Sequence, residues 1–358
     1  MSKRLSPIYP WTRNPLIISA PMRIMSGPAL AISVSRAGGL GFLGPGAKTQ
    51  DTLTDLEEAS SLLQRESFFR TSPGHSKPPG LLPIGTGFQL WNDDLEIASS
   101  AVKKYKPCAA WLFAPRNGQR DLNTWSRRLR TSSPNTQIWV QIGTVSEVRS
   151  LIAQGAERPD VIVVQGSEAG GHGRAHDGAG LISLLPEVAD LLESSGVNDI
   201  PLVAAGGITD GRGALAALCL SASGVAMGTR FLASTEARIA SGYQGEIVRA
   251  SEGGRSTTRT LLYNHLRGTY GWPEGYSPRT IINRSFIEYE QGKSFEELKV
   301  LHDEAAKGSD TDAGWGPEGR LATYAGMSVG LIEDVKGAEE IVKDVLDYIR
   351  PRAGVLLE

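Results

Sequence analysis

The stretch VIVVQGSEAGGHGR, residues 161–174, joins four apolar β-forming residues to a glycine-rich turn. An apolar run that ends in glycines is typical of a buried strand. The turn carries Gln165, Glu168 and His172, so polar side chains follow the carboxyl end of that strand. Enzymes with α/β folds hold their chemistry at this edge. The stretch therefore predicts an α/β enzyme.

Seven more runs of this kind lie along the chain, each bounded by Gly or Pro, and segments with helical periodicity separate them. This alternation predicts parallel strands joined by right-handed crossovers, and a count of eight favours a closed (β/α)8 TIM barrel over an open doubly wound sheet. The eight expected strands are Leu16–Ser19, Leu40–Gly44, Leu82–Gly87, Ala109–Ala114, Ile138–Ile142, Val161–Gln165, Leu202–Ala205 and Gly224–Gly228.

The alternation stops after Phe231. Residues 240–312 hold helical patterns and turn residues without a convincing buried strand, which predicts an inserted helical subdomain. Val335–Ile349 fits a final helix that covers the barrel. We therefore expect a barrel of residues 1–239 and 313–358, and a helical insertion at 240–312 that shapes the substrate pocket.

The charge balance points to a small-molecule partner. The 358 residues include 37 Lys and Arg against 39 Asp and Glu, a formal net charge of −2. Nucleic acid and anionic membrane surfaces require a positive footprint that this balance lacks. The amino terminus lacks the apolar core of a signal peptide, and no window reaches the roughly 18 apolar residues of a membrane span. Cys108 and Cys219 lie in apolar stretches typical of buried free thiols, which favours a reducing, cytoplasmic location.

Two glycine-rich turns follow the last two expected strands, at residues 206–213 (GGITDGRG) and 228–230 (GTR). In a TIM barrel these turns commonly bind a phosphate through backbone N–H groups. Gly206 and Gly207 would let the backbone approach the anion, and Asp210 is placed to cap the next helix. The alternative is that both are merely tight turns between strand and helix.

His172 is the candidate catalytic residue. Glycines at 170, 171 and 173 flank it, and an imidazole whose pKa lies near neutrality suits removal of a proton from carbon. A structural histidine that satisfies loop carbonyls is the alternative. His176 lies four residues on, the spacing of two metal ligands on a helix, but so many glycines make a poor helix and no third ligand is evident. No metal site is expected.

Three other motifs allow more than one interpretation. GMSVG at 326–330 fits the GxSxG hydrolase elbow, but no strand precedes Ser328 and no histidine follows it. GLGFLG at 39–44 has the letters of a dinucleotide turn, yet it follows a helical segment and fits a helix C-cap better. In SAPM, residues 19–22, the proline ends the first strand. This rigid turn either presents main-chain atoms to a flat ring or does no more than end the strand.

Taken in order, several motifs resemble those of the nitronate monooxygenase family, formerly called 2-nitropropane dioxygenases. They are APM (20–22), AGGLGFLG (37–44), QGSEAGGHG (165–173), PLVAAGGITDG (201–211) and VAMGTRFL (225–232). The likeness covers most of residues 15–236 and continues in Arg259–Asn264 and Tyr324–Leu331. GGHGR here, in place of the bacterial GGHRG, is closer to fungal members.

The resemblance implies an FMN-dependent TIM barrel whose catalytic base is His172. The phosphate would lie between Gly206–Gly207 and Gly228–Thr229, as the glycine turns also suggest. Gly87 replaces an Asn that touches the flavin in many bacterial members, so Gly87 is expected beside the flavin. The other implied flavin contacts are Ala20, Pro21, Met22, Gln165, Gly170, Gly207, Ala226, Met227, Gly228 and Thr229.

The implied reaction is the oxidation of an alkyl nitronate by O2 to a carbonyl compound and nitrite. His172 would either take the α-proton of a nitroalkane or stabilise a preformed nitronate anion. Rival functions are NAD(P)H-dependent reduction of an enoyl thioester on a similar flavin barrel, and a flavin-free lyase or isomerase that uses the same phosphate site. A non-catalytic scaffold fits the clustered polar groups least well. A homodimer is one assembly compatible with this expectation.

Overall fold

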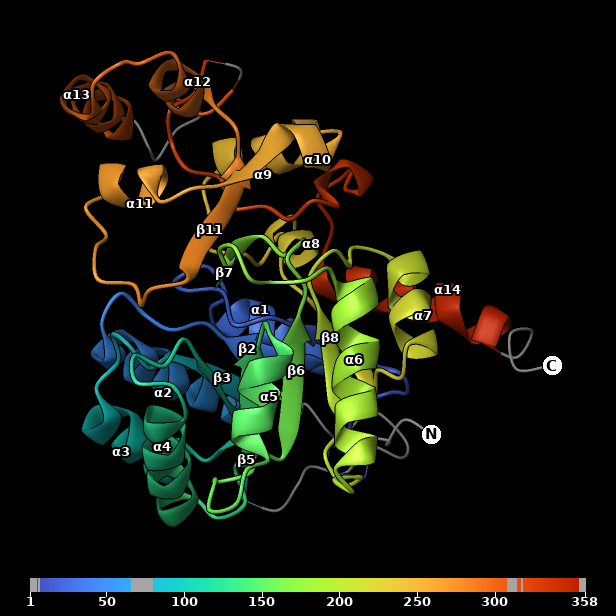
Figure 1. Ribbon diagram of the computed structural model, residues 1–358. Coiled ribbons are helices and arrows are strands. Elements are labelled where there is room, and N and C mark those ends of the chain that lie inside the picture. The colour runs from blue at the N-terminus through green and yellow to red at the C-terminus, as the bar shows by residue number, and fades with distance from the viewer. Residues whose placement is uncertain (1–4, 6, 66–79, 308–313, 317, 354–358) are drawn as a thin grey trace.

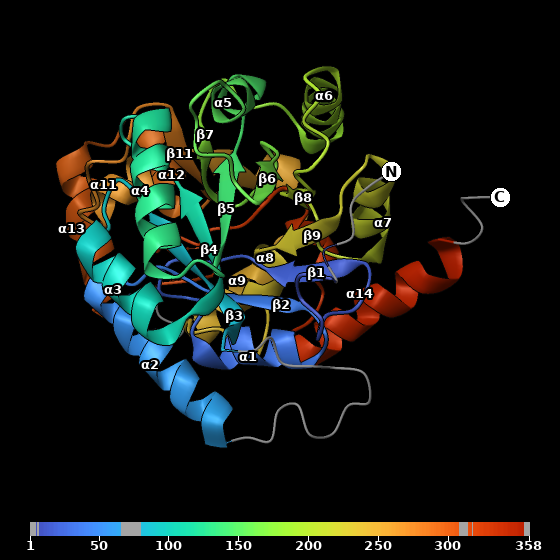
Figure 2. The same ribbon diagram turned by 90° about the horizontal axis from the view of Figure 1, so that it is seen from below.

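The computed structural model describes residues 5, 7–65, 80–307, 314–316 and 318–353. Its centre is a closed barrel of eight parallel strands in the order β1-β2-β3-β4-β5-β6-β8-β9, seen end-on in Figure 2. The strands are β1 Leu16–Ser19, β2 Leu40–Leu43, β3 Leu82–Gln89, β4 Pro107–Phe113, β5 Gln137–Ile142, β6 Val161–Gln165, β8 Leu202–Ala205 and β9 Gly224–Met227. The (β/α)8 expectation is confirmed, and each expected strand overlaps an observed one.

Helices surround the barrel (Figures 1 and 2). They are α1 Pro28–Arg36, α2 Thr49–Arg65, α3 Leu95–Tyr105, α4 Gln119–Ser132, α5 Val145–Leu151, α6 Leu181–Ser194, α7 Gly211–Cys219, the short α8 Thr229–Leu232 and the final α14 Ala338–Ala353. Asp210 caps α7 as predicted, since its carboxylate accepts hydrogen bonds from the Arg212 and Gly213 N–H groups. Within the described ranges, no helix has the length and apolar character needed to cross a membrane.

Two apolar layers hold the barrel together. The larger lies between the strands and the helices and includes Ile162 and Val164 of β6. The second fills the barrel interior, where Trp139 donates a 2.8 Å hydrogen bond to the hydroxyl of Tyr9, from the segment before β1. The thiol prediction holds only in part, because Cys108 is buried but Cys219, the last residue of α7, is exposed.

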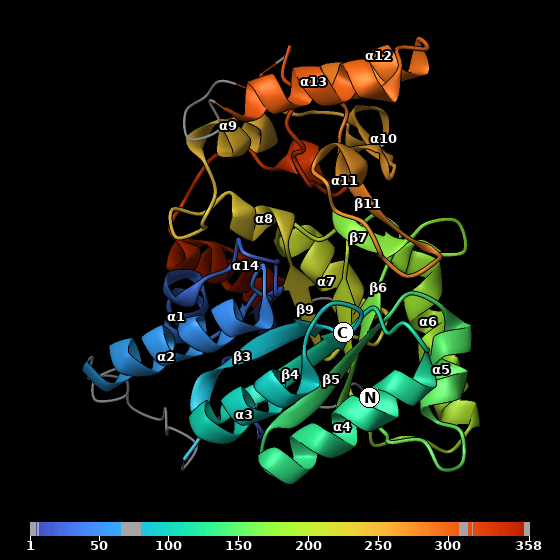
Figure 3. The same cartoon turned by 90° about the vertical axis from the view of Figure 1, so that its left-hand side faces the viewer.

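Residues 240–307, which we call the cap, lie beyond the carboxyl ends of the barrel strands (Figures 1 and 3). Their elements are α9 Ser241–Arg249, α10 Gly253–Ser256, β10 Thr257–Arg259, α11 Leu262–Leu266, β11 Tyr276–Ile281, α12 Arg284–Glu290 and α13 Phe295–Ala306. The expectation of an insertion without a buried strand was wrong, since β11 is largely buried.

The cap strands join a three-stranded antiparallel sheet with a strand from the barrel side, β7 Gly171–Arg174. In this sheet, β11 pairs with β7 so that Pro278 lies opposite His172. Neither GHGR nor YSPRTI has the apolar alternation that identifies a strand locally. Each becomes a strand because the other supplies its partner, and this pairing places His172 between barrel and cap.

Candidate active site

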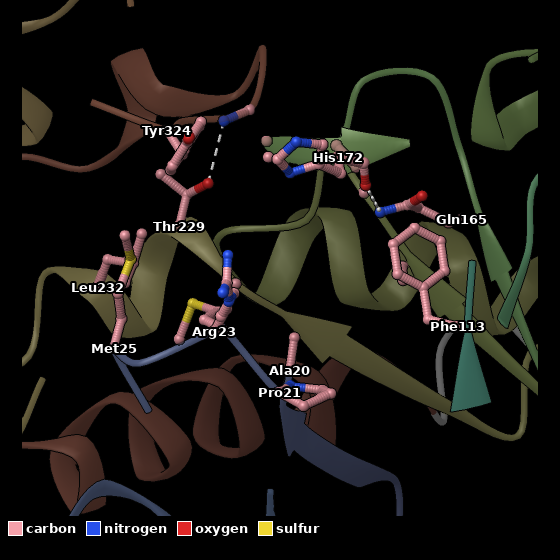
Figure 4. Close-up of a pocket in the computed structure, with 18 of the residues that line it drawn as sticks. Ala20, Pro21, Arg23, Met25, Phe113, Gln165, His172, Thr229, Leu232 and Tyr324 are labelled. Carbon is pink, nitrogen blue, oxygen red and sulfur yellow. Dashed lines mark hydrogen bonds between the residues drawn. The ribbon is translucent and has the colours of Figure 1, made fainter. Parts of the chain in front are cut away.

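A cavity of about 390 Å³ lies at the carboxyl ends of the barrel strands, beneath the cap. Its barrel side, the floor, comes from the ends of β1, β3, β4, β5, β6, β8 and β9 and the turns that follow them. Its cap side, the roof, includes Arg267, Thr269 and Trp272, together with Tyr324 from the later chain and His172 from β7. Figure 4 shows the floor residues Ala20 and Pro21 on the opposite side of this space from His172.

Most of the residues expected at the site line this one cavity. They are Ala20, Pro21, Met22, Gln165, Gly170, His172, Gly206, Gly207, Ala226, Gly228 and Thr229. His172 comes from β7, and the others come from four strand ends and the turns after them, which the closed barrel brings to one rim.

Gly87 and Met227 are the two expected residues that do not line the cavity. Gly87 lies behind the floor, where a Cβ would stand 2.4 Å from the Cβ of Pro21. It therefore lets Pro21 pack against β3. The side chain of Met227 is fully buried among the core residues between barrel and helices, and its carbonyl accepts the Ala20 N–H at 3.0 Å. Both residues support the β1 turn from behind.

The glycine pair after β8 has a backbone that other residues rarely adopt. Gly206 and Gly207 have φ values of +96° and +72°, and a Cβ on Gly206 would lie 2.9 Å from the carbonyl oxygen of Gly166. Two successive left-handed glycines turn the chain sharply and expose main-chain groups at the cavity wall. Such a turn is a suitable cradle for an anion.

Thr229 completes this end of the cavity from the turn after β9. Its hydroxyl oxygen accepts the N–H of Gly326 at 3.0 Å, which leaves the O–H proton available to a ligand (Figure 4). Gly326 and Ser328, from the GMSVG motif, also line the cavity. That motif serves as a wall next to a short 3₁₀ turn, Val329–Leu331, with no strand leading into Ser328.

His172 is held in place by partners from the cap. Its Nε2 lies 2.9 Å from the amide nitrogen of Asn264 in α11, and its ring stacks on the indole of Trp272 with centroids 3.6 Å apart and planes 5° from parallel. The Tyr324 hydroxyl lies 3.5 Å from the other amide atom of Asn264, its oxygen. Because an amide nitrogen can only donate, Asn264 donates to Nε2, and the neutral ring then carries its proton on Nδ1.

The surroundings of His172 disfavour its charged form. Burial lowers the pKa of His172 to about 3, and the positive charges of Arg259, Arg267 and Arg23 act in the same direction. The imidazole is therefore neutral at physiological pH. Nδ1 forms no hydrogen bond to any residue that the structure describes, so it is free to meet a ligand.

Arg259, in β10, fixes the loop that carries His172. Its guanidinium donates to the carbonyl oxygens of Gly171, Ser277, Ser167 and Ala169, at 3.2, 2.5, 3.3 and 3.0 Å. Burial lowers the pKa of Arg259 to about 10, so the side chain stays charged. This one residue ties the glycine-rich turn to the cap sheet.

Three glutamines come from the ends of β3, β5 and β6: Gln89, Gln141 and Gln165. The Gln141 carbonyl accepts the indole N–H of Trp111 at 2.8 Å, and Gln165 donates to the His172 carbonyl at 3.3 Å. The side-chain amide oxygen of Gln89, Oε1, is buried and has no partner within the described residues. These side chains place amide groups on the floor, where they can hydrogen-bond to the polar edge of a bound ring.

Sequence reasoning found only one of these glutamines. The expected third strand ended at Gly87, which left Gln89 outside it, and Gln141 was inside an expected strand but was not singled out. Asn264 and Tyr324 were also missed, although both belong to the motifs RTLLYN and YAGMSVGL that carry the resemblance. Nothing in their local sequence marks them as neighbours of His172.

Glu168 and His176 do not line the cavity. The Glu168 carboxylate accepts the N–H of Leu181, at 2.9 and 3.0 Å, and so caps α6. His176 is exposed and follows β7, so the two histidines are not on one helix. No cluster of three His, Cys, Asp or Glu side chains that could hold a metal occurs in the described part of the chain.

Comparison with known proteins places the chain in a family. The family described as nitronate monooxygenase matches residues 121–346. Nitronate monooxygenase npaC of Metarhizium robertsii is 59% identical over 97% of this chain and 94% of its own length. Nitronate monooxygenase of Neurospora crassa is 32% identical over 98% of this chain and 93% of its own.

A solved structure has the same fold. The structure of FabK from Thermotoga maritima superposes with a TM-score of 0.69, at 26% identity, and the match covers 99% of this chain and 98% of that one. The match to the family extends over barrel and cap alike, and the identity to the fungal relative covers nearly every residue. This chain is a member of the nitronate monooxygenase family.

Proposed function

We propose that this protein oxidises alkyl nitronates with O2, to a carbonyl compound and nitrite, with FMN as its cofactor. The observation that carries the proposal is the shared cavity. The neutral imidazole of His172 lies on one side of it, and the main-chain turns Ala20–Met22, Gly206–Gly207 and Gly228–Thr229 lie on the other.

The residues of the floor fit a flavin mononucleotide. The left-handed pair Gly206–Gly207 and the free O–H of Thr229 suit a phosphate at one end. The unpartnered side-chain oxygen of Gln89 and the side-chain amide of Gln141 suit the donors and acceptors of a pyrimidine edge at the other end. Pro21 and Met22 provide a flat, apolar bed between them. When bound, FMN would supply the redox chemistry that no side chain of the chain can perform.

His172 is proposed to act on the substrate through Nδ1. The chain Tyr324 hydroxyl, Asn264 amide and His172 Nε2 places the ring proton on Nδ1. From there the imidazole donates a hydrogen bond to a nitronate oxygen, an anion that gains stability from a charge-assisted bond. The nearby guanidinium groups of Arg23 and Arg267 favour the same negative charge.

A preformed nitronate is therefore the better substrate. A neutral nitroalkane would need Nδ1 to accept a proton, which requires the other tautomer and a protonated ring. Burial and the neighbouring positive charges make that state costly. The roof therefore favours the binding of an anionic substrate over a neutral one.

The visible spectrum of the purified protein tests the proposal. A bound flavin should lose its absorbance on anaerobic addition of propyl-2-nitronate and regain it with air, with release of nitrite, whereas 2-nitropropane at the same pH should bleach it far more slowly. Rapid NADH oxidation with an enoyl thioester and no reaction with nitronate would favour the reductase. A protein that remains colourless after reconstitution with FMN would contradict both.

A further inference from the structure

The segment 268–276, GTYGWPEGY, contributes Thr269 and Trp272 to the roof of the cavity, and Trp272 contacts Trp91 and Phe113, which lie at or just beyond the ends of β3 and β4. Gly268, Gly271 and Gly275 have φ values of +70°, +86° and +85°, which only glycine adopts freely, so three sharp turns shape this segment. The segment leads directly into β11, which holds it against β7. Its turns bring the side chain of Trp272 to the cavity.

Trp272 lies between the cavity and a second layer of aromatic rings. On the cavity side its indole covers one face of His172. On its other sides it contacts Trp91 at 4.9 Å, Phe113 at 6.2 Å and Tyr276 at 6.4 Å between ring centroids. Phe113 also lines the cavity, whereas Trp91 and Tyr276 do not, so these two residues form the outer layer. Trp272 is thus the ring that separates the space beside His172 from this outer layer.

Both residues of the outer layer have anchors other than Trp272. Tyr276 belongs to β11, and its hydroxyl donates to Glu147 Oε1 at 3.3 Å. Arg116 donates to the Trp91 carbonyl at 3.1 Å, and its guanidinium lies 5.9 Å from the Trp91 ring centre. The indole N–H groups of Trp91 and Trp272 are buried without a hydrogen-bond partner among the residues described. Trp272 is therefore held by ring packing alone, and its removal would leave an apolar recess that Trp91 still closes.

We propose that Trp272 sets the length of alkyl chain that the enzyme accepts. The inference rests on the proposed function, because a nitronate whose oxygen meets His172 Nδ1 has its carbon substituents beside the indole. A short substituent fits against this ring, and a longer one collides with it. Replacement of the indole by a small side chain would open the recess bounded by Trp91, Phe113 and Tyr276 to the end of the chain.

The experiment compares kcat/KM for primary nitronates from ethyl- to hexylnitronate, using the flavin-loaded enzyme and its Trp272→Ala and Trp272→Phe variants. Each methylene that gains an apolar contact improves kcat/KM about fourfold. The hexyl-to-ethyl ratio should rise at least tenfold in Trp272→Ala and about threefold in Trp272→Phe. Trp125→Phe is the matched control, because Trp125 is buried on α4 against Phe88, away from the cavity, and its ratio should stay within twofold of the native enzyme.

A ratio that stays within twofold in both Trp272 variants, at native flavin content, would overturn the inference. If Trp272→Ala fails to fold, the threefold shift in Trp272→Phe carries the test. If the native enzyme turns over no nitronate, the proposed function fails instead. The inference is then decided by calorimetric binding of nitrohexane against nitroethane, whose affinity ratio must rise in the Trp272 variants by the same factors, and an unchanged ratio rejects it.

Discussion

The floor and the roof of the cavity consist of different chemical groups. The floor presents main-chain atoms, glycines and amide side chains at the ends of barrel strands, each fixed by the parallel ladder. The roof presents an imidazole, an indole, a phenol and a guanidinium from His172, Trp272, Tyr324 and Arg267, held by one another. A rigid main-chain surface suits an invariant cofactor, and a side-chain surface can change to suit a substrate. The difference predicts which variants lose the flavin and which lose only selectivity.

Among substitutions in the floor, we expect Gly206→Val to reduce flavin binding most. A valine has no comfortable left-handed conformation, and its Cβ would clash with the Gly166 carbonyl, so the turn must move away from the anion. We expect bound FMN to fall at least tenfold, as measured by the ratio of flavin to protein absorbance.

Gly196→Ala is the matched control for this loss. Gly196, after α6, also has a left-handed φ, of +69°, but nothing lies within 4 Å of an added Cβ. This variant should lose about 1 kcal/mol of stability and keep its flavin. Equal flavin loss in both variants would mean that general destabilisation, and not the phosphate cradle, empties the site.

Substitutions in the roof should lower catalytic activity without loss of the flavin. In His172→Ala the hydrogen bond to the nitronate anion is lost, and a bond to a charged group contributes about 1.5–3 kcal/mol, so kcat/KM for propyl-2-nitronate should fall about 10- to 100-fold. Flavin content should stay near the native level. His176→Ala, four residues on and exposed, should match the native enzyme in both measurements. A His172→Ala enzyme with native kcat/KM would remove His172 from the chemistry.

The same contrast explains what the sequence could predict. All eight barrel strands were found, because each is a short apolar run with glycine or proline at its ends, and their closure brings the glycine-rich turns together. The roof was not found, because β7 and β11 are polar strands that exist only as partners. His172 was singled out by its glycines, but its contacts with Asn264 and Trp272 join residues 92 and 100 positions away. No local pattern encodes such contacts.

The electrostatics of the roof predict a pH-dependent stability. The folded state keeps His172 neutral down to about pH 3, whereas the unfolded chain protonates it near pH 6.5. Between these values the unfolded state binds more protons, so the free energy of unfolding falls as pH falls below 6.5. At pH 5 this loss should reach about 1–2 kcal/mol. Urea unfolding of the native protein and of His172→Gln at pH 7 and 5 measures it.

The variant should lose less stability than the native protein between these two pH values, by the same amount. His302 in α13, whose pKa burial also lowers, contributes equally to both proteins and cancels in the comparison. Identical losses in the two proteins would show that the environment of His172 does not suppress its charge.

The smallest structural change, one atom in the side chain of Asn264, separates the two roles of His172. Asn264→Asp replaces the amide nitrogen that faces Nε2 by a carboxylate oxygen, which can only accept. The imidazole must then carry its proton on Nε2, and Nδ1 becomes a base instead of a donor. The new negative charge also raises the pKa of His172 toward a useful value for proton abstraction. The charge-assisted hydrogen bond from Nδ1 to the nitronate is lost, as in His172→Ala, so nitronate oxidation should again slow about 10- to 100-fold.

Use of neutral nitroethane should rise relative to that of ethylnitronate in this variant, whereas Asn264→Leu, which offers neither donor nor acceptor, should slow both. Asn283→Asp serves as the control, since Asn283 is a buried cap residue that hydrogen-bonds Tyr263 and does not line the cavity. If Asn264→Asp leaves the ratio of the two substrates unchanged, the tautomer of His172 does not decide between them. In that case the roof selects its substrate by shape and overall charge alone.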